Sequence, residues 1–258
     1  MIAEAADLNF VTHGTWIARH LVSMEVREDS DLVVVDSGLR CDTFNLVCRA
    51  RLAPSTAALR AEGVVAYFRD VGRPFSWWVG PADRPADLGS ILRGEGLVAS
   101  ESELLMAADL SSIGDDVFRP GELHVERVRT PQQLRDFADV SAANWNPPDP
   151  LVAGFYAMAE EVALRAECPL RFYVGYVDGI PVATAELTIG GGVAGLYNIS
   201  TRASYRRRGF GTAMTMRPLL DARERGHTTA ILQASPDGIR LYQRVGFQAF
   251  GEITEFKP

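Results

Sequence analysis

The sequence lacks long apolar runs and is poor in cysteine, histidine and lysine. No stretch of about eighteen or more residues is wholly apolar, which argues against a membrane-spanning helix. The first residues, MIAEAADLNF, place no basic group before an apolar stretch, so we expect no secretory signal. The three cysteines and four histidines are scattered and fit no metal-binding spacing. These absences predict a reduced, cytoplasmic protein with no membrane partner and no metal.

Positive charge is scarce as well, since lysine occurs only at Lys257 and the formal net charge is −7. Residues 1–120 hold 11 arginines against 18 acidic residues, whereas residues 121–258 hold 15 basic and 15 acidic residues. The overall acidity argues against nucleic acid as the main partner. The asymmetry favours two units, and the apolar fraction of 47% is ordinary for folded domains.

The first unit, residues 1–115, reads as mixed α/β. Apolar runs on both sides of the turn-rich Asp36–Gly38 predict two strands, and apolar residues at helical spacing predict a helix ending near Gly72. A polar stretch with Gly and Pro then predicts a linker. In order, we expect two strands within 31–52, a helix at 55–72, a strand at 75–81, a helix at 85–96, a strand at 101–110 and the linker at 116–122.

The second unit, residues 123–258, contains the clearest hairpin of the chain. Alternating apolar residues on both sides of Asp178-Gly179 predict two strands joined by a tight turn. Prolines in NWNPPDP (144–150) predict a break between two helical segments. The remaining expected elements are strands at 123–130, 193–201, 228–235 and 247–256, and helices at about 211–225 and 237–246.

The stretch YRRRGFGTAM (205–214) lies at a predicted junction between a strand and a helix. A helix start offers unpaired backbone N–H groups and a partial positive charge, which together bind anions. Gly209 and Gly211 remove side chains that would block a phosphate, although Gly-x-Gly also occurs as mere tight packing. The P-loop pattern needs a lysine that is absent, and Met214 stands where the dinucleotide fingerprint needs its third glycine.

The motif Arg206-Arg207-Arg208-Gly209-Phe210-Gly211 resembles the Q/R-x-x-G-x-G/A motif of the GNAT superfamily of acyl-CoA-dependent N-acyltransferases. The preceding LYNIST and the downstream LYQRVGF stand where that family carries its pantetheine-binding strand and its second signature. The resemblance covers about residues 123–258. It implies an α/β GNAT fold, a mixed twisted sheet flanked by helices, and acetyl-CoA or another acyl-CoA as co-substrate.

The resemblance also assigns roles to individual residues. Tyr242 stands where the family has a tyrosine that protonates the leaving thiolate, and Ser235 stands where many members carry an asparagine that contacts the coenzyme. Many members have Gly where Arg207 stands, and Arg207 is expected to supply its N–H in the same way provided that its φ stays negative. The backbone of Ile199, Ser200 and Thr201 is expected to pair with pantetheine, and the motif residues Arg206, Arg207, Arg208, Gly209, Phe210, Gly211 and Thr212 to hold the pyrophosphate.

The general base is less clearly marked. Glu186, on the strand before LYNIST, either faces the site as the base or is a solvent-facing residue of an alternating hairpin. A water-mediated base and binding of an already neutral amine both stay open. Trp145 and Phe172 either line an acceptor pocket or belong to the core.

Three functions remain in view. An N-acyltransferase acting on a primary amine of a small molecule or peptide is favoured over a catalytically quiet acyl-CoA sensor, and a nucleic-acid-binding role is opposed by the acidity. The first unit is either a degenerate copy of the same fold, as in tandem members of the superfamily, or an unrelated α/β cap. A homodimer is left open.

Overall fold

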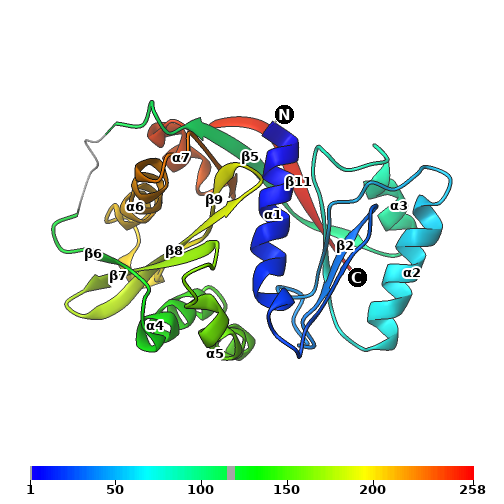
Figure 1. Ribbon diagram of the computed structural model, residues 1–258, viewed down its shortest axis with the longest axis horizontal. Coiled ribbons are helices and arrows are strands. Elements are labelled where there is room, and N and C mark those ends of the chain that lie inside the picture. Colours follow the sequence, from blue (N-terminus) through cyan, green and yellow to red (C-terminus); the bar gives the residue numbers. More distant parts are fainter. Residues whose placement is uncertain (1, 115–119) are drawn as a thin grey trace.

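A computed structural model describes residues 2–114 and 120–258, so residues 116–119 of the predicted linker lie outside the described residues. Its strands form a single eleven-stranded sheet in the order β1-β2-β3-β4-β11-β5-β10-β9-β8-β7-β6, and helices flank the sheet (Figure 1). The predicted α/β class, with a mixed sheet, is therefore confirmed.

The elements of the first unit follow the predicted order closely, with two additions. A long helix, α1, and a short strand, β1, precede all the expected elements and were not predicted from the sequence. The elements are α1 (Ile2–Arg19), β1 (Glu25–Glu28), β2 (Val33–Asp36), β3 (Leu46–Cys48), α2 (Ala57–Asp70), β4 (Ser76–Val79), α3 (Leu88–Gly94) and β5 (Val98–Asp109).

The second unit also matches the expected order. The predicted hairpin turns at Asp178-Gly179, where both residues have positive φ angles of 50° and 77°. The elements are β6 (His124–Arg127), α4 (Pro131–Ala142), α5 (Pro150–Ala163), β7 (Leu170–Val177), β8 (Ile180–Gly190), β9 (Val193–Thr201), the short 3-10 helix η1 (Ala203–Tyr205), α6 (Phe210–Glu224), β10 (Thr229–Ala234), α7 (Ile239–Val245) and β11 (Gln248–Lys257).

The two halves of the sheet repeat one topology. The series β1-β2-β3-β4-β11 and β7-β8-β9-β10-β5 have the same pairings in the same order: two antiparallel pairs, a parallel pair and a further antiparallel pair. The helices repeat too, since α2 and α6 each follow the third strand of a series, and α3 and α7 each follow the fourth. This duplication favours the degenerate-copy interpretation of the first unit over an unrelated cap.

The last strand of each unit is exchanged with the other. β11 pairs with β4 and β5, both from the first unit, and β5 in turn pairs with β10 from the second. The long antiparallel pairing of β5 with β11 lies at the centre of the sheet. The predicted boundary near residues 116–122 therefore divides the sequence, while the sheet runs continuously across it.

Apolar residues of the strands in the second unit face helices on both sides of the sheet. Along β7, Tyr173 belongs to the core beneath α6, whereas Phe172 and Val174 belong to the core beneath α4 and α5. In Figure 1, α1 lies in the middle of the molecule, between the helices of the two units. No helix in the described ranges is long and apolar enough to span a bilayer.

Candidate functional site

The candidate site begins where two parallel strands separate. β9 and β10 pair only at Ala194–Ala230, Gly195–Ile231 and Leu196–Leu232. Beyond Leu196, β9 continues along β8, and beyond Leu232, β10 continues along β5. The two strands therefore leave an opening, and the predicted pantetheine-binding residues Ile199, Ser200 and Thr201 lie on the β9 side of it, past the point of separation.

The chain runs from β9 through η1 to the amino end of α6. Gly209 is the residue before the helix and has φ +82°, a left-handed conformation that suits glycine. The first intrahelical bond runs from the N–H of Ala213 to the carbonyl of Gly209, at 3.2 Å. The N–H groups of Phe210, Gly211 and Thr212 thus have no partner within the helix and are available to an anion.

Two of the three arginines of the motif, Arg206 and Arg208, are bonded to the protein. Arg206 donates from Nε to the carbonyl of Thr201, at 3.0 Å. Arg208 donates from Nε to Glu122, at 2.9 Å, and its guanidinium lies over the ring of Phe210. The condition of a negative φ at Arg207 is not met, because its φ is +65°. The backbone adopts at Arg207 the left-handed conformation that glycine adopts most easily.

Tyr242 lies on α7 and, like Ser235, lines the adjoining cavity. Its ring packs edge-on against Phe247, with centroids 6.1 Å apart. Burial, with a smaller contribution from the charge of Glu103, raises the pKa of Tyr242 to about 12. The phenol is therefore protonated at neutral pH, and its hydroxyl has no hydrogen-bond partner among the described residues.

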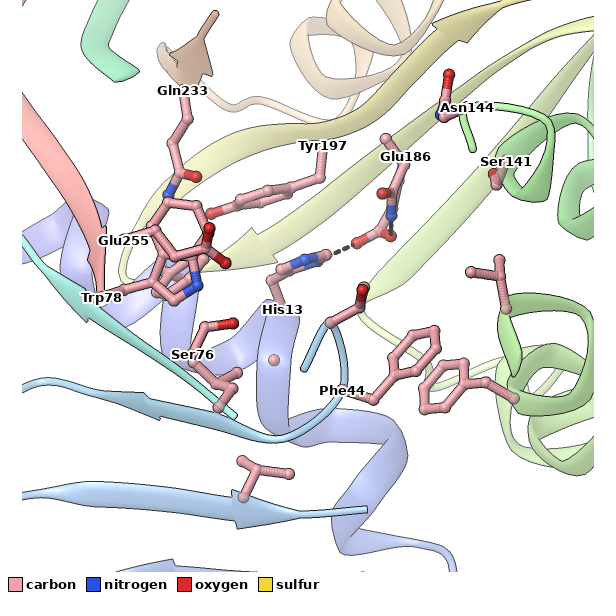
Figure 2. A pocket seen from close by; sticks show the side chains of 18 of the residues that line it. His13, Phe44, Ser76, Trp78, Ser141, Asn144, Glu186, Tyr197, Gln233 and Glu255 are labelled. Carbon is pink, nitrogen blue, oxygen red and sulfur yellow. Dashed lines mark hydrogen bonds and ion pairs between the residues drawn. The ribbon is translucent and has the colours of Figure 1, made fainter. Parts of the chain in front are cut away.

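A cavity of about 620 Å³ lies between the two units and is lined by residues of both. Figure 2 shows side chains from α1 and from the strands of each unit directed into it. Trp145 lines this cavity, whereas Phe172 is buried in the core, 2% exposed, and does not line it. Lining residues also include Phe10, His13, Phe44, Trp78, Glu101, Glu103, Asn144, Tyr156, Tyr197, Asn198, Gln233, Glu255 and Lys257.

Glu186 is buried and bonded, so its interpretation as a solvent-facing hairpin residue is wrong. It is 1% exposed, and its carboxylate accepts from the Thr188 hydroxyl at 2.6 Å and from the Asn198 amide at 2.8 Å. The third partner is the ring of His13, whose Nδ1 lies 2.7 Å from Oε1 of Glu186. The burial arises because α1 covers this face of β8, and α1 was not predicted from the sequence.

Three further carboxylates line the cavity from the exchanged strands β5 and β11. Glu101 and Glu255 are directly opposite each other in the β5–β11 pairing, and Glu103 lies two residues farther along β5. Burial, followed by repulsion from Glu101 and Glu255, raises the pKa of Glu103 to about 7. Glu255 is neutralised in part by Lys257, whose Nζ is 3.1 Å away.

Comparison with known proteins bears on this geometry. The model of the acetyltransferase (GNAT) family matches residues 134–247, which include the opening, the amino end of α6 and Tyr242. These residues form a GNAT acetyltransferase domain. An uncharacterized N-acetyltransferase from Streptomyces avermitilis is 34% identical over 138 residues, and the match covers 48% of this chain and 32% of that protein. This chain thus spans about a third of that relative's length, and the matches support acyl transfer in general.

Solved structures extend the likeness across both units. A GCN5-related N-acetyltransferase from Kribbella flavida has a TM-score of 0.71 at 18% identity, covering 97% of this chain and 95% of its own. A tandem GNAT protein from the clavulanic acid biosynthesis pathway has a TM-score of 0.63 at 14% identity, covering 92% and 84%. At these identities the likeness concerns the fold alone, and it is consistent with the tandem GNAT arrangement, one of the two alternatives that the sequence left open.

The first unit has no open counterpart of the GNAT domain's strand separation. After β3 and β4 part, their chains meet again, because the N–H of Arg84 donates to the carbonyl of Ala50 at 2.9 Å and the N–H of Leu52 donates to that of Arg84 at 3.2 Å. The loop RARLAPST (49–56) before α2 contains Pro54 and no glycine. The equivalent opening is thus closed by the chain itself.

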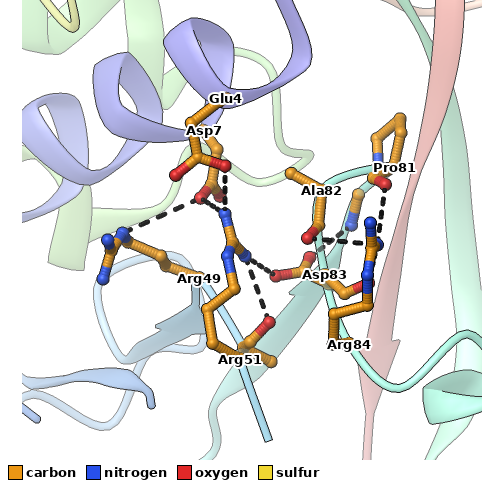
Figure 3. Close-up of polar contacts among 10 residues, drawn as sticks. Glu4, Asp7, Arg49, Arg51, Pro81, Ala82, Asp83 and Arg84 are labelled. Carbon is orange, nitrogen blue, oxygen red and sulfur yellow. Dashed lines mark hydrogen bonds and ion pairs between the residues drawn. The ribbon is translucent and has the colours of Figure 1, made fainter. Parts of the chain in front are cut away.

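Ion pairs fix this closed region (Figure 3). Arg51 bonds to Glu4 at 2.8 Å, to Asp7 at 2.6 Å and to Asp83 at 3.0 Å. One guanidinium does not neutralise three carboxylates, and burial of Asp83 outweighs the attraction of Arg51. The pKa of Asp83 is accordingly raised to about 7.

The site residues that sequence reasoning missed come mainly from outside the GNAT domain. His13 and Phe10 lie on α1, and Trp78, on β4, packs edge-on against Phe10. The sequence offered one signal, a stretch of residues 2–19 without proline and with apolar residues at helical spacing. Nothing in the sequence connects His13 with Glu186, which is 173 residues away.

Proposed function

We propose that the protein transfers an acetyl or related acyl group from acyl-CoA to a primary amine of a small molecule or peptide. The observation that carries this proposal is the separation of β9 from β10, because Ile199 of β9, Ser235 after β10 and Tyr242 of α7 all line one cavity. The chain runs from β9 through η1 into the amino end of α6, and a coenzyme with an extended arm and a diphosphate fits this arrangement. The reaction class follows from the GNAT domain and its N-acetyltransferase relative.

The residues present fit the coenzyme. The backbone of Ile199, Ser200 and Thr201 is free of β10 and can pair with the pantetheine amides as an added strand. The diphosphate would be held at the start of α6 by backbone N–H groups between Arg207 and Thr212, with Ser235 on the opposite side of the opening. Arg206 and Arg208 would act chiefly by shaping the loop, since both are already bonded to the protein.

Tyr242 acts as the general acid in this proposal. The bound coenzyme supplies a thioester, whose carbonyl is open to attack by an amine. Tyr242 donates its hydroxyl hydrogen to the departing sulfur, which is a contact that strengthens as negative charge develops there. A pKa raised to about 12 keeps the hydroxyl protonated over the neutral range, as the role requires.

Glu186 takes part in removing the proton of the amine by holding the group that accepts that proton. Its burial and its three hydrogen bonds fix it in place and remove it from direct contact with solvent. The amine enters from the cavity between the units, where Glu101, Glu103 and Glu255 favour a cationic acceptor.

We assign residues 1–115 and 123–258 as the two units, and propose that only the second holds coenzyme, because the first has a closed opening. The cytoplasmic location, and function without metal or nucleic acid, belong to the same proposal. A homodimer stays a prediction.

The decisive experiment follows release of free thiol from acetyl-CoA over a panel of primary amines. Wild type is expected to turn over at least one amine, and Tyr242→Phe is expected to lose about 100-fold or more in kcat while retaining coenzyme affinity. Tyr176→Phe is the matched control, because its hydroxyl bonds to Asp136, away from the cavity. Coenzyme binding without turnover of any amine would favour the quiet sensor. Turnover unchanged in Tyr242→Phe would remove the assignment of the acid.

A further inference from the structure

We propose that His13, on α1 of the first unit, is the general base that removes the proton from the attacking amine, and that Glu186 positions it. The inference rests on the proposed acyl transfer and adds to it a catalytic residue outside the GNAT domain. It makes the reaction site a composite of both units, with the coenzyme held by one and the base supplied by the other.

The hydrogen bonding of the pair determines which ring nitrogen is free. A carboxylate only accepts hydrogen bonds, so the contact of 2.7 Å between Nδ1 of His13 and Oε1 of Glu186 places the hydrogen on Nδ1. The neutral ring then carries its lone pair on Nε2. No hydrogen bond from the described residues reaches Nε2, and the His13 side chain is 24% exposed, on the cavity wall.

The ring of His13 lies at the point where β9 and β10 separate. It stacks on Tyr197, with centroids 3.9 Å apart and planes 4° apart. Tyr197 directly follows Leu196, the last β9 residue paired with β10. Figure 2 shows His13 directed at Glu186, with Tyr197 beside it. A thioester at the inner end of the opening would therefore lie next to the imidazole.

α1 is fixed to the second unit one helical turn before His13. The buried Asn9 donates from Nδ2 to the carbonyls of Thr188, Gly190 and Val193, at 3.0 to 3.1 Å. Its Oδ1 accepts from the Tyr197 hydroxyl at 2.8 Å. Since residues four apart lie on the same face of a helix, Asn9 and His13 meet the β8–β9 hairpin together. This anchoring gives the imidazole a defined position against β9.

Glu186 acts through His13 rather than on the amine. Its three donors, from His13, Thr188 and Asn198, occupy the carboxylate, and its exposure of 1% contrasts with 24% for the His13 side chain, so His13 is the more accessible member of the pair. A buried carboxylate that holds Nδ1–H fixes both the tautomer and the ring orientation of the histidine. Glu103, at the Tyr242 end of the cavity, is the competing base that the experiment must separate.

The reaction exchanges one bond at the carbonyl carbon for another. The neutral amine nitrogen bonds to the thioester carbonyl carbon, and the carbon–sulfur bond breaks. The proton leaving nitrogen goes to Nε2 of His13, and the sulfur takes the hydroxyl proton of Tyr242. One proton then passes through water from the His13 imidazolium to the Tyr242 phenolate, which restores both groups and leaves an amide and a free thiol.

The test compares His13→Gln with His20→Gln. His20 immediately follows α1 but does not line the cavity, so the same substitution there is a matched control. His13→Gln is expected to lower kcat about 100-fold or more, and imidazole added to His13→Ala is expected to restore part of the turnover. Coenzyme affinity by calorimetry is expected to stay within about twofold in both glutamine variants.

A second readout needs no turnover. Nitrogen-15 spectra of the four histidine rings are expected to show His13 with hydrogen on Nδ1, and Glu186→Gln is expected to disturb that tautomer. The opposite tautomer, or equal turnover in wild type and His13→Gln, would overturn the inference while leaving the proposed function intact. If Glu103→Gln lost turnover and imidazole did not rescue His13→Ala, the role of general base would be assigned to Glu103 instead of His13. A wild type that turns over no amine would overturn the proposed function and this inference together.

Discussion

Replacing Gly209 by alanine tests whether the backbone before α6 binds the diphosphate. Gly209 has φ +82°, and an alanine in that region costs about 1–2 kcal/mol relative to its preferred conformations. The altered loop has two ways to accommodate this cost. It keeps the left-handed conformation and lowers the stability of the fold, or it relaxes to a negative φ and must be forced back when coenzyme binds.

The two outcomes are measurable together. A loop that relaxes raises the Kd for CoA by about 5- to 30-fold, which is the same 1–2 kcal/mol expressed as affinity. A loop that stays strained lowers the free energy of unfolding by that amount and leaves the Kd unchanged. Calorimetric titration with CoA gives the loss of binding free energy, and urea unfolding of the same preparation gives the loss of free energy of unfolding. The sum of these two losses is expected to be about 1–2 kcal/mol.

Two variants serve as controls for Gly209→Ala. Gly226, just beyond the other end of α6, has φ +86° and no atom within 4 Å of an added Cβ, so Gly226→Ala is expected to lower stability without affecting CoA binding. Arg208→Ala removes a charge whose guanidinium is already paired with Glu122, and is expected to change the Kd by at most about threefold. A larger effect of Arg208→Ala than of Gly209→Ala would refute the backbone interpretation.

Three further predictions concern backbone strain, burial and stoichiometry. Arg207→Gly is expected to raise the free energy of unfolding by up to about 1 kcal/mol relative to Arg207→Ala, because only glycine relieves the left-handed φ; equal stability of the two variants would contradict this. The pKa of Asp83 is raised to about 7 in the folded state, so the folded chain keeps a proton that the unfolded chain loses near pH 4. Between those two values, the contribution of Asp83 to the free energy of unfolding therefore falls by about 1 kcal/mol for each unit by which the pH rises. Asp83→Asn is expected to remove this part of the pH dependence of the free energy of unfolding, measured by urea unfolding at pH 5, 6 and 7. An unchanged pH dependence would contradict the burial argument. Calorimetry is expected to give one CoA per chain, whereas two would show that the opening of the first unit is not closed.

Features set by neighbouring residues were predictable from the sequence. The Asp178-Gly179 hairpin and the helix start after Gly209 each depend on a few residues with specific φ angles or hydrogen-bonding needs. The φ of Arg207 escaped prediction because arginine does not favour the left-handed region, and the surrounding loop imposes it. Local propensity therefore predicted where the loop lies but not that Arg207 adopts a left-handed conformation in it.

Features that depend on distant parts of the chain were not predictable. β5 and β11 both read as strands, but no local pattern indicates that β11 pairs with β4 and β5 rather than within its own unit. Glu186 was equally ambiguous, since an alternating hairpin residue is exposed or buried according to what covers it, and α1 is the cover. A single histidine in a sequence carries no role until its partner is known, which is why His13 was missed.

The exchange of β5 and β11 gives a physical reason why a composite site can be precise. General base catalysis requires the base within hydrogen-bonding distance of the amine, and an error of about 1 Å reduces the rate strongly. A flexible connection between two independent units would not hold α1 to that tolerance. Here the units share one hydrogen-bonded sheet, because β11 has all its strand partners in the first unit and β10 pairs with β5. The bonds of Asn9 to the β8–β9 hairpin then fix α1 on that common frame, so the closed first unit contributes to chemistry through position even though its own opening holds no coenzyme.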